Sequence, residues 1–294
     1  MAAATGEGAF ESRFVTAKDG LRLHVRLYGR PVSGRLPLLC LPGLSRNAGD
    51  FDVIARAVAA DRQVVALDYR GRGLSDWDPN WQNYALPVEL EDLLTVTAAL
   101  DVAKAVFLGT SRGGLLTMLA GVVRPDLLAG AILNDIGPVI EGAGLARIRG
   151  YLGQLREPTN LDEAVALLKS AGADRFPGLS DADWRGQAGS IWTGKDGHFA
   201  PAFDPALAKM LENADFDAPL PTLWPQFDGL QGAPAMVVRG EHSDILSVET
   251  VAAMAARRPD LEQLTVPGQG HAPLLTDAAS IRRIADFAAR CDGA

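Results

Sequence analysis

The chain has 294 residues, a length that suits one large α/β domain with or without an insertion. Apolar residues make up 48% of it and charged residues 22%, so the composition is that of a folded globular protein and not of a disordered one. A net charge of −8, without any cluster of lysines and arginines, argues against a nucleic-acid partner.

The number of cysteines and the lengths of the apolar runs indicate the cellular compartment in which the protein is expected. The chain contains only Cys40 and Cys291, too few for a disulfide framework or a Cys-x-x-Cys metal site. Residues 1–10 lack the basic start and apolar core of a secretory signal, and no apolar run reaches the roughly 18 residues of a membrane span. We expect a soluble cytoplasmic protein without a membrane partner. Homodimerisation stays open.

In chain order, the first expected element is a hairpin over residues 14–15 and 21–28, with its turn at Asp19-Gly20. Short apolar runs closed by Gly, Pro or Asp then predict six buried strands, at residues 38–41, 64–69, 105–108, 131–134, 235–238 and 263–266. Helical patterns lie between them, at residues 51–60, 87–100, 114–123, 248–257 and 277–289. The alternation predicts an α/β fold whose mainly parallel sheet is covered by helices.

The alternation stops between residues 139 and 232, where helical segments such as 161–170 are separated by Pro and Gly. We predict that this inserted segment is a helical cap on a core domain formed by residues 1–138 and 233–294. It holds three of the five tryptophans, Trp184, Trp192 and Trp224. These rings are expected to form the core of the cap, and a wall facing the substrate is the alternative.

The strongest chemical signal is the segment Gly109–Gly113, Gly-Thr-Ser-Arg-Gly, between a predicted strand and a predicted helix. A serine on such a tight turn needs small residues two positions before and after it, because larger side chains would strike the strand and the helix. The turn exposes the Ser111 Oγ beside the partial positive charge of a helix N-terminus. Ser111 is therefore predicted to be a nucleophile. A glycine-rich helix start without chemistry is the alternative.

A serine hydroxyl needs a general base near neutral pH, and His271 is the expected base because it follows the last predicted strand. A carboxylate must hold the tautomer of that base and stabilise the imidazolium. Asp244 follows the strand at 235–238 and gives the chain order Ser, Asp, His, so it is the expected acid. Asp135, at the end of the preceding strand, is the alternative acid. The carboxylate that is not used is expected to bond backbone amides of its own loop.

The negative charge of a tetrahedral intermediate needs two N–H donors. We expect them to be the backbone amides of Arg112, which follows the nucleophile, and of Leu44, in the loop after the strand at 38–41. A plain turn is the alternative reading of that loop. Arg46 and Trp192 are candidate substrate-binding residues. Arg46 and Arg112 would favour an anionic substrate, and the alternative is that both are solvent-exposed or salt-bridge residues. This chemistry requires no metal or cofactor.

These motifs resemble the α/β-hydrolase superfamily over the chain from about Arg13 to the last helix, and its capped branch most closely. Asp68–Ser75 is similar to the Arg-Gly-x-Gly-x-Ser signature of that branch, while Asn134–Pro138 and Gly270-His271 stand at the expected places. Leu41–Gly43 has Pro where the branch commonly has His, which is a departure. The resemblance implies the α/β-hydrolase fold, a mostly parallel eight-stranded sheet flanked by helices with an inserted helical cap.

The residue at the turn divides this branch by activity. Haloalkane dehalogenases and epoxide hydrolases carry aspartate there, whereas esterases, lactonases, amidases and C–C bond hydrolases carry serine. Ser111 thus implies attack on an acyl carbonyl and an acyl-enzyme that water, activated by His271, hydrolyses. A small carboxylic ester or lactone is the expected substrate. A C–C bond hydrolase and an acyltransferase or perhydrolase with the same triad are alternatives, followed by a small-molecule receptor of the same fold.

Overall fold

The computed structural model describes residues 10–152, 156–195 and 198–293. Residues 1–9, most of the segment that the sequence predicts not to be a secretory signal, lie outside the described residues. In the described part of the chain, no helix is both long enough and apolar enough to cross a bilayer.

Eight strands form one sheet, in the order β1-β2-β4-β3-β5-β6-β9-β10. Their bounds are β1 Glu11–Thr16, β2 Arg22–Tyr28, β3 Leu38–Leu41, β4 Val64–Leu67, β5 Ala105–Thr110, β6 Leu128–Asn134, β9 Ala235–Gly240 and β10 Glu262–Val266. Strand β2 is antiparallel to β1 and to β4, and the other neighbouring strands are parallel. The sheet confirms the predicted fold class, although β6 begins three residues earlier than predicted.

The place of a strand in the sheet explains its sequence pattern. Strands β3 and β4 lie inside the sheet with helices on both faces, so all their residues are buried and their sequences are continuous apolar runs. Strand β10 is an edge strand, and its residues alternate between more and less exposed positions. The carboxyl ends of β3, β5, β6, β9 and β10 all lie at one edge of the sheet, because these strands run parallel.

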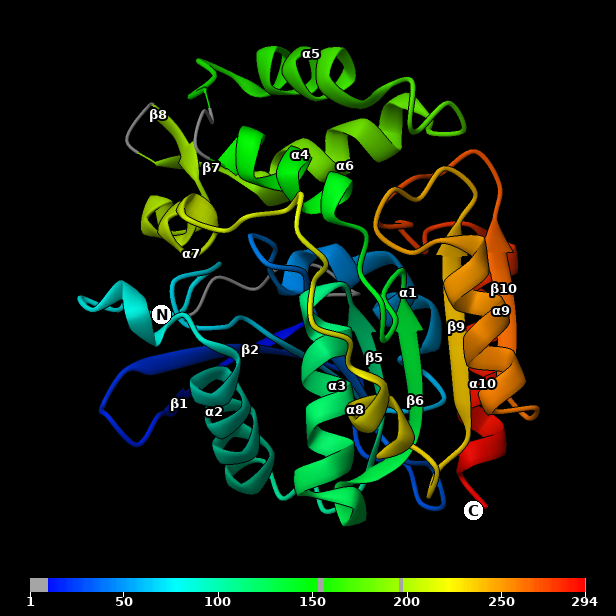
Figure 1. Cartoon of the computed structure of the whole chain (residues 1–294). Coiled ribbons are helices and arrows are strands. Elements are labelled where there is room, and N and C mark those ends of the chain that lie inside the picture. The colour runs from blue at the N-terminus through cyan, green and yellow to red at the C-terminus, as the bar shows by residue number, and fades with distance from the viewer. Residues whose placement is uncertain (1–9, 153–155, 196–197, 294) are drawn as a thin grey trace.

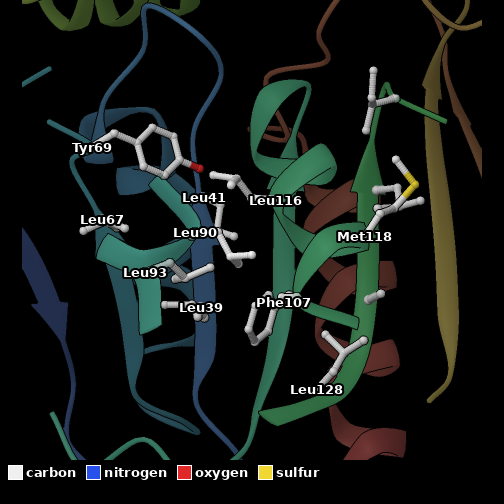
Figure 2. Packing of buried hydrophobic residues seen from close by; sticks show 14 of the residues in the cluster. Leu39, Leu41, Leu67, Tyr69, Leu90, Leu93, Phe107, Leu116, Met118 and Leu128 are labelled. Atoms are coloured by element: carbon white, nitrogen blue, oxygen red, sulfur yellow. The ribbon is translucent and has the colours of Figure 1, made fainter. Parts of the chain in front are cut away.

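Helices cover both faces of the sheet (Figure 1). Those outside the inserted segment are α1 Asp52–Val58, α2 Leu86–Ala99, α3 Arg112–Val123, α9 Val248–Arg257 and α10 Ala278–Cys291. Helices α1 and α10 pack with one apolar cluster, whereas α2, α3 and α9 pack with the other. Figure 2 shows part of the second cluster, in which Leu39 of β3, Phe107 of β5 and Leu93 of α2 are fully buried. Burial of this apolar surface holds the sheet edge in place.

Most of the inserted segment lies beyond the carboxyl ends of the parallel strands, at the top of Figure 1, whereas its last helix, α8, lies lower, against α3. Its elements are α4 Gly142–Leu152, α5 Leu161–Gly172, α6 Asp181–Ile191, β7 Trp192–Lys195, β8 His198–Pro201, α7 Lys209–Glu212 and α8 Trp224–Asp228. The antiparallel pair β7–β8 was not predicted. Helix α6 starts with a capping box between Ser180 and Asp183, which satisfies amides at its N-terminus.

The three tryptophans of the inserted segment have different surroundings. Trp192 packs in a small apolar cluster with Ala164 and Ala188. Trp184 is buried and meets the ring of Phe176 edge-on, with centroids 6.2 Å apart. Trp224 packs against the main core instead, together with α8, which lies on α3. The expectation that all three form a core of the inserted segment is therefore wrong for Trp224.

Candidate active site

Ser111 lies on the sharp turn between β5 and α3. Its φ of 51° is in the left-handed region, which a non-glycine residue adopts only at a cost. A Cβ on Gly109 would lie 2.4 Å from the carbonyl oxygen of Gly113, and a Cβ on Gly113 would lie 2.1 Å from that of Leu41. Glycine is therefore the residue that fits at both positions, and the turn presents the Ser111 Oγ at the sheet edge.

A continuous hydrogen-bonded chain joins a serine, a histidine and an aspartate. The Nε2 of His271 lies 2.9 Å from the Oγ of Ser111. Its Nδ1 lies 2.8 Å from Oδ2 of Asp135. The Asp135 side chain is fully buried and that of His271 is 7% exposed, so little water competes for these bonds. This arrangement can move a proton from the serine to the histidine and stabilise the imidazolium that results.

The structure corrects the expected acid. Asp244 was expected to contact His271, but it pairs with Arg147 of α4, whose Nη2 donates to Oδ1 at 2.8 Å. No hydrogen bond joins Asp244 to His271 among the described residues. The order Ser, Asp, His could not separate the candidates, because Asp135 also lies between Ser111 and His271 in the sequence.

Local backbone geometry explains why Asp135 takes this place. Asp135 follows β6 directly, with a φ of 57°. Its Oδ1 accepts a hydrogen bond from the Gly240 amide at 2.7 Å, and its Oδ2 accepts one from the Ser243 hydroxyl at 2.6 Å. The loop after β9 thus holds the Asp135 carboxylate through Ser243, while the next residue, Asp244, extends toward the inserted segment.

Asp244 still carries a charge near the site, because it pairs with Arg147 at the cavity wall. Burial opposes its ionisation, but the hydrogen bond and charge of Arg147 outweigh burial and hold the pKa of Asp244 below its ordinary value. Burial lowers the pKa of Arg147, and Asp244 more than offsets this effect. Asp244 and Arg147 are therefore an ion pair at neutral pH.

Both expected oxyanion donors belong to segments beside Ser111. Arg112 is the first residue of α3, where backbone amides have no partner within the helix. Leu44 lines the cavity in front of Ser111, and a Cβ on its neighbour Gly43 would lie 3.9 Å from the Cβ of Ser111. A carbonyl oxygen bound at Ser111 would therefore lie near both segments.

A buried ionic network connects these two segments. Arg72 Nε donates to the Leu44 carbonyl oxygen at 2.8 Å, and Arg72 Nη1 lies 2.8 Å from Oε1 of Glu89 in an ion pair without hydrogen-bond alignment. Glu89 Oε2 accepts a hydrogen bond from Arg112 Nε at 2.6 Å. Burial opposes ionisation of Glu89, but the charges of Arg72 and Arg112 hold its pKa below the ordinary value. In the signature Arg-Gly-x-Gly-x-Ser the defined arginine is Arg70 and Arg72 stands at a variable position, so no sequence signal pointed to Arg72 or to Glu89.

A cavity of about 730 Å³ opens in front of Ser111, within the range of small-molecule sites. Its walls come from the sheet edge and from the inserted segment. Arg46 lines it and is tied by its Nε to Oδ2 of Asp50 at 2.7 Å and by its Nη2 to Oε1 of Gln187 at 2.6 Å. Trp192 lines it too, and so does Trp184. The tryptophans thus serve both as apolar core and as cavity wall.

Sequence reasoning missed three arginines of the cavity wall, Arg147, Arg156 and Arg175. All three belong to the inserted segment, and nothing in their local sequence indicates which way they face.

The two cysteines lie away from the cavity wall and are buried in the core as free thiols. Burial raises the pKa of Cys291 to about 11, and that of Cys40 also rises.

No group of three or more His, Cys, Asp or Glu side chains that could hold a metal ion occurs within residues 10–152, 156–195 and 198–293.

Asn134 also supports the site. Its Nδ2 donates to the hydroxyl of Thr110 and to the carbonyl of Pro273, each at 3.0 Å. These bonds connect the ends of β5 and β6 with the loop that carries His271, and so support the geometry of the site.

The chain is similar to known hydrolases along most of its length. It is 35% identical over 268 residues to the 3-hydroxybutyrate-oligomer hydrolase of Cupriavidus necator, covering 88% of this chain and 90% of that protein. It is 28% identical over 272 residues to the 2-(acetamidomethylene)succinate hydrolase of Mesorhizobium japonicum, covering 92% of each.

A solved structure and a family match agree with these relatives. The crystal structure of an alpha/beta hydrolase from Novosphingobium aromaticivorans superposes with a TM-score of 0.89 at 40% identity, covering 97% of this chain and all of that one. Residues 38–284 match the family described as the alpha/beta hydrolase family. With its sheet order, its strand-to-helix turn at Ser111 and these similarities, the chain belongs to the alpha/beta hydrolase family.

Proposed function

We propose that this hydrolase cleaves a carboxylic ester through an acyl-enzyme on Ser111. The observation that carries the proposal is the hydrogen-bonded chain from Ser111 through His271 to the buried Asp135. A serine in this setting loses its proton to the imidazole as it attacks, which makes a weak nucleophile effective near neutral pH.

The steps follow from the contacts. His271 Nδ1–H donates to Asp135, which leaves Nε2 free to accept the Ser111 proton while Oγ attacks the acyl carbonyl. The amides of Leu44 and Arg112 bind the oxyanion. The imidazolium gives its proton to the departing alkoxide, and an acyl-enzyme remains. Water, deprotonated by His271, then attacks the acyl carbon, releases the acid and restores Ser111.

The proposal assigns the triad acid to Asp135 and gives Asp244 another role. Asp135 has two donors besides His271, the Gly240 amide and the Ser243 hydroxyl, and these fix its orientation. Asp244 instead holds Arg147 at the cavity wall. Its charge adds to the field at His271 without a hydrogen bond.

An ester is the favoured bond class among the carbonyl substrates that this chemistry allows. The relative from Cupriavidus necator is named for hydrolysis of an oligomer of a hydroxy acid, and such units are joined as esters. Lactones, C–C bonds and transfer of the acyl group to an acceptor other than water use the same triad, so they are outcomes that the experiment must separate.

A panel of p-nitrophenyl acyl esters of increasing chain length tests the proposal. Ser111→Ala removes the nucleophile and should lower kcat by about 10⁴- to 10⁶-fold. Ser33→Ala, at an exposed turn position, is the matched control and should leave kcat unchanged. Equal rates for the wild type and Ser111→Ala would overturn the nucleophile assignment. Product analysis with an added alcohol or peroxide would identify a transferase, if transfer exceeds hydrolysis.

A further inference from the structure

The cavity wall carries more positive than negative charge, although the whole chain has a net charge of −8. Four arginines line it, namely Arg46, Arg147, Arg156 and Arg175. Among the described residues that line the cavity, Asp50 alone is acidic. An acidic protein that concentrates guanidinium groups around one cavity is suited to a negatively charged ligand there.

Two of the four guanidinium groups are already paired. Arg46 bonds Asp50, and Arg147 bonds Asp244. Each carboxylate offsets one positive charge, so these two arginines contribute shape and polarity to the wall more than net charge. The excess charge comes from the other two.

Arg175 lacks a matched carboxylate. The nearest one belongs to Asp174, 3.8 Å from Nη1, and that side chain is 79% exposed to water. Its Nη2 donates to the carbonyl of Ala171, while its Nε is buried and has no hydrogen-bond partner among the described residues. Because Nε has almost no accessible surface, a ligand would have to meet this guanidinium through its Nη groups, and the Arg175 side chain as a whole is 28% exposed.

Arg175 also lies next to the loop that carries His271. A Cβ on Gly270 would lie 3.2 Å from the Cβ of Arg175, and the Gly178 amide donates to the Gly268 carbonyl at 3.0 Å. Residues 175–178 of the inserted segment therefore rest on the residues just before His271. This contact holds Arg175 beside the loop that carries the proposed general base.

Arg156 supplies the second excess charge. It lines the cavity, its side chain is exposed, and no ion pair holds it within the described residues. Its backbone is anchored, because the Trp192 Nε1 donates to its carbonyl oxygen at 3.2 Å. The remainder of the nearby wall is apolar, with Leu168, Phe176 and Trp184.

We propose that the ester substrate carries a free carboxylate, and that Arg175 binds it with Arg156 adding to the positive potential of the wall. The inference rests on the proposed ester hydrolysis at Ser111. A planar guanidinium can donate two parallel hydrogen bonds to a carboxylate, which makes the contact both strong and directional. The apolar wall takes the uncharged body of the ester.

Matched ester pairs test this inference, each pairing a carboxylate with the neutral amide of the same shape. One pair carries the group on the alcohol side, 3-(butyryloxy)butanoate and 3-(butyryloxy)butanamide. The other carries it on the acyl side, monomethyl glutarate and its amide. The wild type should prefer the carboxylate in at least one pair by about 10- to 100-fold in kcat/KM.

Arg175→Gln should remove most of that preference by lowering kcat/KM for the carboxylate while kcat/KM for the neutral amide stays within about twofold. Arg156→Gln should reduce the preference less. The matched control is Arg185→Gln, because Arg185 is an exposed arginine of α6 that pairs with Asp162 and does not line the cavity. It should leave the preference unchanged.

Every outcome decides the question. Equal kcat/KM for carboxylate and amide in both pairs, with Ser111→Ala inactive, would overturn the inference and leave the proposed function standing. An equal fall for both members in Arg175→Gln would show a structural role only and would also overturn it. If the wild type hydrolyses no ester of either kind, or Ser111→Ala keeps its activity, the proposed function fails and the inference fails with it.

Discussion

The sheet edge that carries Ser111 and the inserted segment that faces it are built from different kinds of contact. At the sheet edge, the triad side chains stand on loops that follow β5, β6 and β10, and the buried strands β5 and β6 hold two of those loops. The inserted segment packs on the core partly through apolar residues, such as Ile148 and Phe227, but polar contacts also hold it to the core around the cavity. Examples are Arg46 with Gln187, Arg147 with Asp244, and Thr276 with Asp183 at 3.0 Å.

This difference suggests that the sheet edge performs the chemical step and that the inserted segment selects the substrate. Apolar packing is close to that of a crystal and leaves little freedom, which suits atoms that must stay within hydrogen-bond distance. Polar contacts between partly exposed side chains are individually weak, and contacts with water can replace them. We therefore expect substitutions at the sheet edge to lower kcat for all substrates, and substitutions in the inserted segment to change which substrates are accepted.

The largest expected effect distinguishes the two carboxylates. Asp135→Asn removes the partner of His271 Nδ1 and should lower kcat about 10⁴-fold, because the imidazole loses its tautomer control and its counter-charge. Asp244→Asn should lower kcat less than about tenfold, since Asp244 bonds Arg147. Steady-state kinetics on a p-nitrophenyl ester measures both. A collapse of kcat in Asp244→Asn alone would reverse the assignment.

The next effect concerns Glu89, which pairs with Arg112 directly and is connected to Leu44 through Arg72. Glu89→Gln leaves Arg72 and Arg112 without their shared buried counter-charge and should reduce the free energy of unfolding by about 3 kcal/mol. It should also lower kcat by about tenfold to a hundredfold, because the Leu44 and Arg112 amides lose their alignment. Urea unfolding and steady-state kinetics measure the two changes.

The control for Glu89 lies on the same helix. Glu91→Gln changes an exposed glutamate of α2 that pairs with Lys18, so it should change neither the free energy of unfolding nor kcat appreciably. If Glu89→Gln lowered stability but left kcat of the folded fraction untouched, the network would support the fold without positioning the oxyanion donors.

The smallest expected effect is the pH dependence of the stability that the Arg147–Asp244 pair contributes to the contact between the two regions. The pKa of Asp244 in the folded chain lies below its ordinary value of 3.8, so the pair with Arg147 stabilises the fold above about pH 4. This contribution is lost as the pH falls through the lowered pKa. Asp244→Asn should therefore cost about 1 kcal/mol at pH 7, and this cost should shrink as the pH falls below 4.

Urea midpoints at several pH values measure this dependence. Asp162→Asn breaks an exposed pair with Arg185 inside the inserted segment and should show little change at any pH. A cost for Asp244→Asn that stays constant from pH 7 to pH 2 would mean that the ion pair does not stabilise the contact.

Several features of the site could be predicted because they are encoded locally. The position of Ser111 follows from small residues at fixed spacing between a strand and a helix, and the steric reason is visible at Gly109 and Gly113. His271 could be chosen from four histidines because a loop after the last parallel strand must end at the same sheet edge.

The identity of the acid could not be predicted in this way. Asp135 and Asp244 both follow parallel strands, both end at the sheet edge and both lie between Ser111 and His271 in the sequence. What separates them is the direction of each side chain, which depends on the φ of 57° at Asp135 and on the bonds from Gly240 and Ser243. No local pattern contains that information.

The sequence by itself determined the strand and helix order outside the inserted segment, the sheet core and the turn at Ser111, because periodic burial and glycine sterics act over a few neighbouring residues. Tertiary structure alone decided that Asp135 meets His271, that Glu89 joins Arg72 to Arg112, and that Arg156 and Arg175 face the cavity. These contacts join residues far apart in the chain, and they exist only once the inserted segment has docked or the strands have taken their places in the sheet.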